Sequence, residues 1–189
     1  SLDEKGKELS KFYMSHAAEI MEFFSRIRSA SLQSLRIRIH GDYHLGQVLF
    51  NGSDYTILDF EGEPESSITE RKIKHSPLKD VAGMLRSFHY AVSAKLYFNS
   101  QAKDIPQEKI ENAVSYWYKG VTHSFLNSYR ETIKGNAVLK AGEEELKYLL
   151  QFHLLEKAVY ELGYELNARP AWVKIPLRGI QQVIKGLSI

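Results

Sequence analysis

Apolar side chains recur every three to four residues along four stretches of the chain, and this spacing predicts amphipathic helices. The sequence Ser76-Pro77 strengthens the second start, because Ser is a common N-cap and Pro fits the first turn. Gly135 is a suitable stop for the third helix. The predicted helices cover residues 9–27, 76–97, 106–133 and 143–167, with a short last helix opened by Pro176.

A different pattern separates the first two helices. Leu35, Ile37 and Ile39 alternate with charged residues, which is typical of a strand, and two short apolar runs flank the turn sequence Asn51-Gly52. Residues 35–60 therefore look like short strands around a loop at 40–47. Residues 61–76 are expected to be irregular. The predicted fold class is mainly α with a small β insert, formed by a single domain.

Composition narrows the function only a little. The chain has 189 residues, 43% of them hydrophobic and 25% charged, with a formal net charge of +2 and a pI near 8.6. This balance argues against nucleic acid and acidic membrane surfaces as partners. The absence of cysteine excludes disulfides and thiolate metal sites. No apolar run approaches the length of a membrane span, so we expect a soluble, cytoplasmic protein.

The loop between the strand-like runs carries a pattern suited to phosphoryl transfer. It reads His-Gly-Asp-Tyr-His-Leu-Gly-Gln over residues 40–47, and Asp59-Phe60 follows the second run. Phosphoryl transfer needs a carboxylate near the attacking hydroxyl and oxygen ligands for Mg²⁺. Asp42 has the position of the base, Gln47 follows it by five residues, and Asp59 has the place of the metal-binding Asp of kinases. Amide and carboxylate oxygens suit Mg²⁺.

The H-G-D-x-H form of this loop resembles the aminoglycoside and choline kinase-like phosphotransferases, and further segments resemble maltokinases, including those fused to trehalose synthases. These segments are residues 40–49, 59–64, 76–88, 156–165, 167–170, 172 and 175–177. The resemblance implies the C-terminal lobe of a protein kinase-like fold. It also implies ATP-dependent, Mg²⁺-dependent phosphorylation of maltose to maltose 1-phosphate, with a trehalose synthase domain as a possible partner.

Under this resemblance the lobe divides into a lead-in helix (1–34), the catalytic loop and hairpin (35–61) and a helical subdomain (76–189). Asp42 is the expected general base, although an Asp that only stabilises the turn is the alternative. Gln47 and Asp59 are the expected metal ligands. Glu61 lies two residues beyond Asp59 and is either a ligand of a second Mg²⁺ or a solvated loop carboxylate.

Three further residues are expected near the base. His44 is a second catalytic candidate, but hydrogen bonds that lock the loop are the favoured role for both His40 and His44. Asp80 falls in the first turn of the predicted helix at 76–97. It is expected either to accept backbone N–H groups of the loop or only to interact with the helix dipole.

A candidate sugar-binding wall lies near the end of the helix at 143–167. Tyr160 and Tyr164 are four residues apart and therefore share a helical face, and Glu165, Arg169 and Trp172 follow. Aromatic faces can cover the C–H surface of a sugar while planar polar groups pair with its hydroxyls. The alternative is that the two tyrosines belong to the core.

Two parts of a working kinase are not found. No two glycines are spaced as G-x-G, and no lysine lies in a strand-like run, so the N-terminal ATP-clamping lobe is expected to be missing and the chain inactive alone. Two other functions stay open: a kinase for another alcohol, such as an aminoglycoside, choline or methylthioribose-like compound, or a non-catalytic interaction module. A zinc hydrolase is disfavoured, because no third ligand accompanies His40 and His44.

Overall fold

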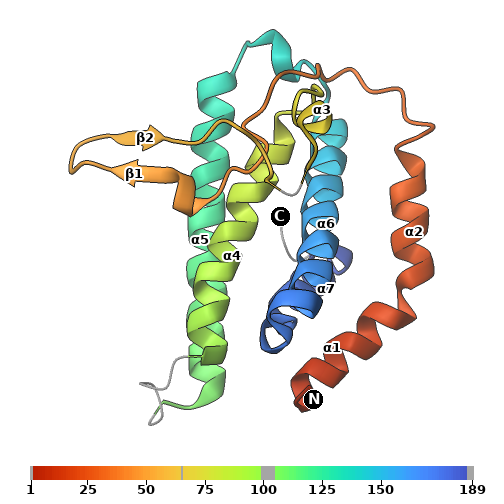
Figure 1. The fold of residues 1–189 in the computed structure, drawn as a ribbon, viewed down its shortest axis with the longest axis vertical. Helices are drawn as coiled ribbons and strands as arrows, with labels where there is room; N and C mark the ends of the chain where they lie inside the picture. The colour runs from red at the N-terminus through yellow and green to blue at the C-terminus, as the bar shows by residue number, and fades with distance from the viewer. Residues whose placement is uncertain (1, 65, 99–104, 187–189) are drawn as a thin grey trace.

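The computed structural model describes residues 2–64, 66–98 and 105–186. Most of these residues are helical, and one small hairpin is the only sheet within them, so the prediction of a mainly α fold with a small β insert is confirmed (Figure 1). Four helices form the body of the molecule: α4 (Leu78–Phe98), α5 (Gln107–Ile133), α6 (Glu143–Ala168) and α7 (Lys174–Ile184). Their bounds lie close to those that the apolar spacing predicts.

Helix α4 is the centre of the packing. It contacts α5 on one side and α6 and α7 on the other (Figure 1). Leu85 of α4, Leu154 and Leu155 of α6 and Ile180 of α7 are almost completely buried where these helices meet. Because burying such a side chain contributes roughly 1.5–3 kcal/mol, the shared apolar face is what fixes the helices around α4.

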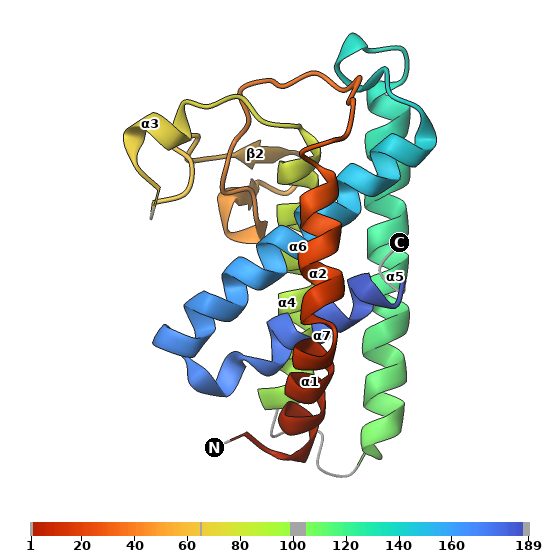
Figure 2. The ribbon, with the colours of Figure 1, turned by 90° about the vertical axis from the view of Figure 1, so that its right-hand side faces the viewer.

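The N-terminal segment forms two helices, α1 (Glu4–Ser15) and α2 (Ala17–Arg26), so the prediction of one helix over 9–27 is wrong. The break is at His16, whose φ of −105° and ψ of 11° are not helical. The His16 ring stacks on Phe12 with 3.9 Å between ring centroids. Helix α1 packs on α7 and α2 continues along the same side of the molecule, so the bend lets the segment follow the body (Figure 2).

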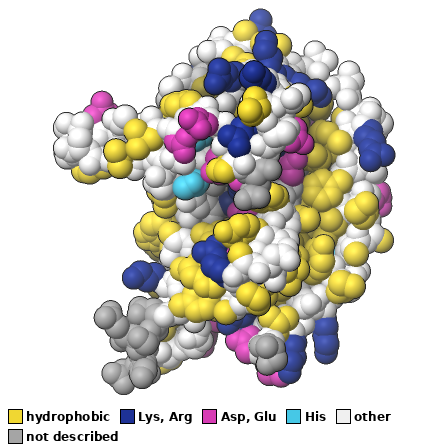
Figure 3. Space-filling view, in the orientation of Figure 1, with side chains coloured by type: hydrophobic (Ala, Val, Ile, Leu, Met, Phe, Trp, Pro, Cys, Tyr) yellow, Lys and Arg dark blue, Asp and Glu magenta, His cyan; other side chains and the backbone are white. Residues whose placement is uncertain are grey.

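The hairpin consists of β1 (Val48–Phe50) and β2 (Tyr55–Ile57), paired antiparallel with Val48 opposite Ile57. It projects from the body, and Figure 3 shows apolar side chains gathered on it. The strand predicted at residues 35–39 is not formed. Ile37 makes only an isolated bridge to His75, because no neighbouring strand is available to extend the ladder.

The short helix α3 (Ile68–Arg71) lies in the segment expected to be irregular, and a capping box of Ser67 and Glu70 explains its start. Two single-turn 3₁₀ helices, η3 (Ala137–Leu139) and η4 (Pro170–Trp172), flank α6, and a third, η1 (Leu45–Gln47), precedes β1. Helix α7 begins at Lys174, two residues before the predicted start at Pro176. Proline is tolerated there because N–H groups of a first turn have no partner within the helix. None of the helices in the described residues combines the length and apolar character needed to cross a membrane.

Candidate active site

The loop at residues 40–47 is fixed to the start of α4. The Asp80 carboxylate accepts hydrogen bonds from the backbone N–H groups of His40 (2.7 Å) and Gly41 (2.9 Å), one on each oxygen. Asp80 lies in the first turn of α4, so the rigid helix carries the anchor. Because hydrogen bonds to a charged group are stronger than neutral ones, this pair restrains the loop backbone just before Asp42.

A buried imidazole then connects the loop to the end of β2. Nε2 of His40 lies 2.6 Å from the carbonyl oxygen of Leu58, and Nδ1 accepts a hydrogen bond from the Asp42 N–H at 3.3 Å. These contacts fit a neutral ring that carries its proton on Nε2. The His40 ring also packs beside Phe60, with 4.9 Å between ring centroids. One side chain thus holds together the two segments that carry Asp42 and Asp59.

Two close backbone approaches complete the frame. Gly41 has a φ of +88°, a conformation that favours glycine, and a Cβ there would make a tight contact, 3.1 Å from the Cα of Gly62. On the other side, a Cβ on Gly83 would lie 2.7 Å from the carbonyl oxygen of Tyr43. Helix α4 can therefore approach the loop more closely than a side chain would allow.

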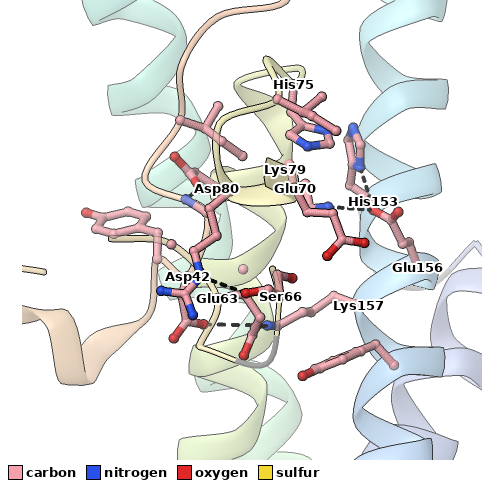
Figure 4. Close-up of a pocket in the computed structure, with 18 residues that line it drawn as sticks. Asp42, Glu63, Ser66, Glu70, His75, Lys79, Asp80, His153, Glu156 and Lys157 are labelled. Carbon is pink, nitrogen blue, oxygen red and sulfur yellow. Dashed lines mark hydrogen bonds and ion pairs between the residues drawn. The ribbon is translucent and has the colours of Figure 1, made fainter. Parts of the chain in front are cut away.

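Asp42 lines a cavity of about 410 Å³, which Figure 4 shows. It is lined by the loop, by one face of α6, by the start of α4 and by Gly62, Glu63, Ser66, Glu70 and Arg71. Oδ1 of Asp42 lies 3.6 Å from Nζ of Lys157, and Oδ2 lies 3.6 Å from Nε2 of His44. The same lysine nitrogen is 3.1 Å from Oε2 of Glu63. The Asp42 carboxylate, which lines the cavity, therefore has an ammonium group and an imidazole beside it.

The opposite end of the cavity holds a second polar group on α4 and α6, which Figure 4 also shows. Nδ1 of His153 is 3.0 Å from Oε2 of Glu156, and Nζ of Lys79 lies 3.8 Å from the same oxygen. Burial favours the neutral form of Glu156, but the His153 hydrogen bond and the charge of Lys79 hold its pKa below the ordinary value. Burial and the nearby Lys79 charge lower the pKa of His75. These shifts favour a neutral His75 imidazole and a charged Glu156 carboxylate.

The two predicted metal ligands lie together. Nε2 of Gln47 is 3.1 Å from Oδ2 of Asp59, and Asp59 has a φ of +57°, a conformation that few residues other than glycine adopt. Exchanging the amide O and N of Gln47 would direct its oxygen toward the carboxylate, and such exchanges are a matter of assignment. An amide oxygen and a carboxylate fit Mg²⁺, which usually keeps several waters and takes its other ligands from substrate phosphates.

Glu61 does not join this pair through any contact described in the structure, and its side chain is exposed. In the described part of the chain, no three His, Cys, Asp or Glu side chains come close enough to hold a metal ion. Gln47 and Asp59 lie next to each other as the prediction requires, but their role as metal ligands stays a prediction, as does a second metal position at Glu61.

The five predicted sugar-binding residues are divided by the structure. Tyr160 lines the cavity that contains Asp42, and the ammonium of Lys157 lies 5.1 Å from the centre of its ring. The other four gather at the C-terminal end of α6 and are absent from the lining of that cavity. Arg169 lies over the rings of both Tyr164 and Trp172, at 5.6 and 4.6 Å.

Glu165 is buried and paired with other side chains, so it is not available to bind a sugar. Its side chain is 1% exposed, it accepts a hydrogen bond from the Tyr90 hydroxyl, and it forms a two-pronged ion pair with Arg169. Trp172 stacks on Phe98 with 4.7 Å between ring centroids. A carboxylate whose two oxygens are already paired has little capacity left for a sugar hydroxyl, so the structure supports Tyr160 alone as part of a wall beside Asp42.

Three of the residues around the cavity were not singled out from the sequence. Glu63 and Lys157 lie in the maltokinase-like segments 59–64 and 156–165 but had no predicted role, and His153 lies in the middle of a long helix. The available signal was periodic: residues 153, 156, 157 and 160 are three or four apart and therefore share one face of α6. Nothing in the sequence shows that this face meets the loop at 40–47.

Comparisons with known proteins give a consistent result. No family model matches the chain. The glucosamine kinase of Streptacidiphilus jiangxiensis is 29% identical over 140 residues, which are 74% of this chain and 30% of that protein. The glucosamine kinase of Mycolicibacterium smegmatis is 45% identical over 60 residues, which are 31% of this chain and 15% of that protein.

Solved structures show the same relation at the level of the fold. Crystal form B of a glucosamine kinase superposes with a TM-score of 0.78 at 21% identity, covering 95% of this chain and 41% of that one. A glucosamine kinase in complex with glucosamine, ADP and inorganic phosphate also superposes with a TM-score of 0.78, covering 94% of this chain and 40% of that one. The chain thus spans less than half the length of these proteins. It is similar in sequence to curated glucosamine kinases and has the fold of the corresponding part of the solved enzymes.

Proposed function

We propose that this chain is the acceptor- and metal-binding part of an ATP-dependent sugar kinase. In this reaction a sugar hydroxyl attacks the γ-phosphorus of ATP, a new O–P bond forms, and the bond to the ADP oxygen breaks. The proton of the hydroxyl passes to Asp42. Two observations support a sugar kinase: the sequence similarity to glucosamine kinases and the residues of the loop, which suit phosphoryl transfer.

The observation that carries the proposal is the position of Asp42. It lies at a cavity large enough for a sugar, on a loop whose backbone is held by Asp80 and His40. A base must keep its orientation while the acceptor binds, and rigid elements provide this better than a free loop does. A positioned base contributes typically ~10²–10⁴ in rate.

Gln47 and Asp59 would hold Mg²⁺ beside this loop. The ion, when bound, neutralises charge on the nucleotide phosphates. The two side chains contribute oxygen atoms from the start of β1 and the end of β2, and the hairpin pairing with the His40 contacts keeps these ends near Asp42.

An amino sugar is the acceptor that we favour. The cavity is lined by five carboxylates (Asp42, Glu63, Glu70, Asp80 and Glu156) and three cationic side chains (Arg71, Lys79 and Lys157). Excess negative charge favours a protonated amine over a neutral disaccharide. The names of the curated relatives agree with this choice. Maltose, which the sequence resemblance implies, is the alternative acceptor in the same assay.

The test measures ATP consumption by the natural polypeptide that contains these residues, with glucosamine, maltose, choline and an aminoglycoside as acceptors. We expect turnover with glucosamine, reduced about 10²–10⁴-fold by Asp42→Asn. Asp54→Asn is the control: it makes the same change of charge in the hairpin turn, outside the cavity, and should leave turnover unchanged. Undiminished turnover by a folded Asp42→Asn variant would remove Asp42 from the mechanism.

A further inference from the structure

Lys157 lies in the maltokinase-like segment 156–165 and lines the cavity, but the predicted site gives it no role. It lies in the middle of α6, and its side chain is 29% exposed, beside Asp42 at 18% and Glu63 at 23%. Its ammonium lies between two carboxylates that come from different segments of the chain, as Figure 4 shows. The aliphatic stem is long and flexible, so the charge can move by a few ångströms without moving the helix.

The other two cationic side chains of the cavity are differently placed. Arg71 donates hydrogen bonds to the backbone oxygens of Ser66 and Pro64, which directs its guanidinium into its own loop. Lys79 faces Glu156 at the opposite end. Among the residues that line the cavity, Lys157 is therefore the cation within ion-pair distance of Asp42.

We expect the ion pairs of Lys157 to contribute only modestly to the stability of the fold. Ion pairs at partly exposed positions contribute little to stability, typically up to about 1 kcal/mol. A cation beside the general base has a clearer use during the reaction, because negative charge spreads over the oxygens of the phosphoryl group as it transfers. Glu63 gives the ammonium a partner at 3.1 Å while no phosphate is present.

We propose that Lys157 is a catalytic cation of this site, held by Glu63 at rest and contacting the transferred phosphoryl group during the reaction. This inference rests on the proposed function. In the step, the acceptor hydroxyl gives its proton to Asp42 as the O–P bond forms and the bond to ADP breaks. Lys157 keeps its proton throughout and supplies only charge and hydrogen bonds to the phosphoryl oxygens.

The experiment compares Lys157→Met with the unsubstituted natural polypeptide. Methionine keeps much of the apolar stem and removes the charge. We expect kcat to fall about 10²–10³-fold, the usual cost of losing one group that stabilises transition-state charge. KM for the acceptor should change little, because the interaction forms mainly in the transition state. Lys174→Met is the matched control: Lys174 is a partly buried lysine paired with Asp3 at 2.8 Å and does not line the cavity, so its loss should leave kcat unchanged.

A second variant separates a catalytic charge from a packing role. Lys157→Ala leaves a space at the cavity wall, and added methylamine or ethylamine should restore part of the lost kcat, whereas ethanol should not. An unchanged kcat in Lys157→Met, or a loss that no amine restores in a normally folded Lys157→Ala, overturns the assignment of Lys157 and leaves the sugar kinase intact. Absence of turnover in the unsubstituted polypeptide with every acceptor overturns the proposed function, and the role of Lys157 with it.

Discussion

At the scale of single residues, a few hydrogen bonds decide where Asp42 points. Asp80 holds two consecutive N–H groups and His40 holds a third, so the three backbone groups that lead into Asp42 all have defined partners. The loop is short and lies partly at the surface, where backbone groups would otherwise bind water. The anchors convert a mobile segment into a fixed one, which is what a general base requires.

Replacing Asp80 with Asn tests this anchor. Asparagine keeps the shape but loses the charge, and its NH₂ group faces a backbone N–H that needs an acceptor. We expect the free energy of unfolding to fall by about 1–3 kcal/mol, as for other lost hydrogen bonds to a charged group, and turnover to fall at least about tenfold. Urea unfolding and the ATP assay measure the two effects.

Asp3→Asn serves as the control for Asp80. Asp3 also accepts a backbone N–H, from Gly6 at the start of α1, but it lies outside the loop and the cavity. Its substitution should lower stability and leave turnover intact. Equal turnover in Asp80→Asn and the unsubstituted protein would show that the anchor does not orient the base.

At the scale of elements, the site depends on how closely α4 approaches the loop. Gly83 is in the interior of α4, where glycine normally lowers helix stability by roughly 0.5–1 kcal/mol relative to alanine. The carbonyl oxygen of Tyr43 explains its presence, since a Cβ at this position would lie 2.7 Å away. The helix propensity of this position is therefore lower than that of alanine because the tertiary contact leaves no room for a Cβ.

Alanine has a higher helix propensity than glycine, but Gly83→Ala should nevertheless destabilise the protein. We expect the loop to be displaced from α4, with lower thermal stability and lower turnover. Gly163→Ala in α6 is the matched case, because no atom lies within 4 Å of its added Cβ. That variant should be more stable by up to about 1 kcal/mol. Differential scanning calorimetry and the ATP assay compare them, and stabilisation by both substitutions would contradict the close approach.

At the scale of the whole molecule, a buried polar network joins the helices behind the cavity. Arg86 of α4 donates two hydrogen bonds to Glu161 of α6, at 2.6 and 2.9 Å, and a third to Nδ1 of His89 at 3.1 Å. A Cβ on Gly179 of α7 would overlap the Arg86 guanidinium. Because Arg86 always donates, the His89 nitrogen that faces it must be an acceptor, and His89 is neutral in the folded protein.

This network predicts how stability depends on pH. Burial, together with the charges of Arg86 and Arg178, lowers the pKa of His89 well below its ordinary value of 6.5. As the pH falls below about 6.5, the unfolded chain gains a proton that the folded protein excludes. The free energy of unfolding should therefore decrease on acidification, by up to about 1.4 kcal/mol per pH unit from this residue. The lowered pKa of His75 acts in the same direction.

The substitution His89→Gln should make the loss of stability between pH 6.5 and 5 shallower, although the variant is less stable at pH 7. Urea unfolding across this range gives the slope. His123→Gln is the control, because His123 is exposed on α5, where its ring forms a hydrogen bond with Asn127. An unchanged slope in His89→Gln would mean that other groups control the acid sensitivity.

Much of the fold followed from local patterns. Apolar periodicity and the signals at Ser76-Pro77 and Gly135 located the long helices, because both features act within a few residues of the chain. The strand at 35–39 and the single helix at 9–27 were predicted wrongly. A strand exists only if another strand pairs with it, and the bend at His16 follows the shape of the body against which α1 and α2 lie.

The candidate site divides in the same way. The sequence by itself indicated Asp42, Gln47 and Asp59, because loop chemistry depends on short spacings that a linear sequence preserves. Only the tertiary structure placed Lys157 and Glu63 beside Asp42, paired Glu165 with Arg169, and separated Tyr160 from the other predicted sugar contacts. Those decisions depend on which face of α6 meets the loop, and that is set by the burial of apolar side chains from helices far apart in the chain.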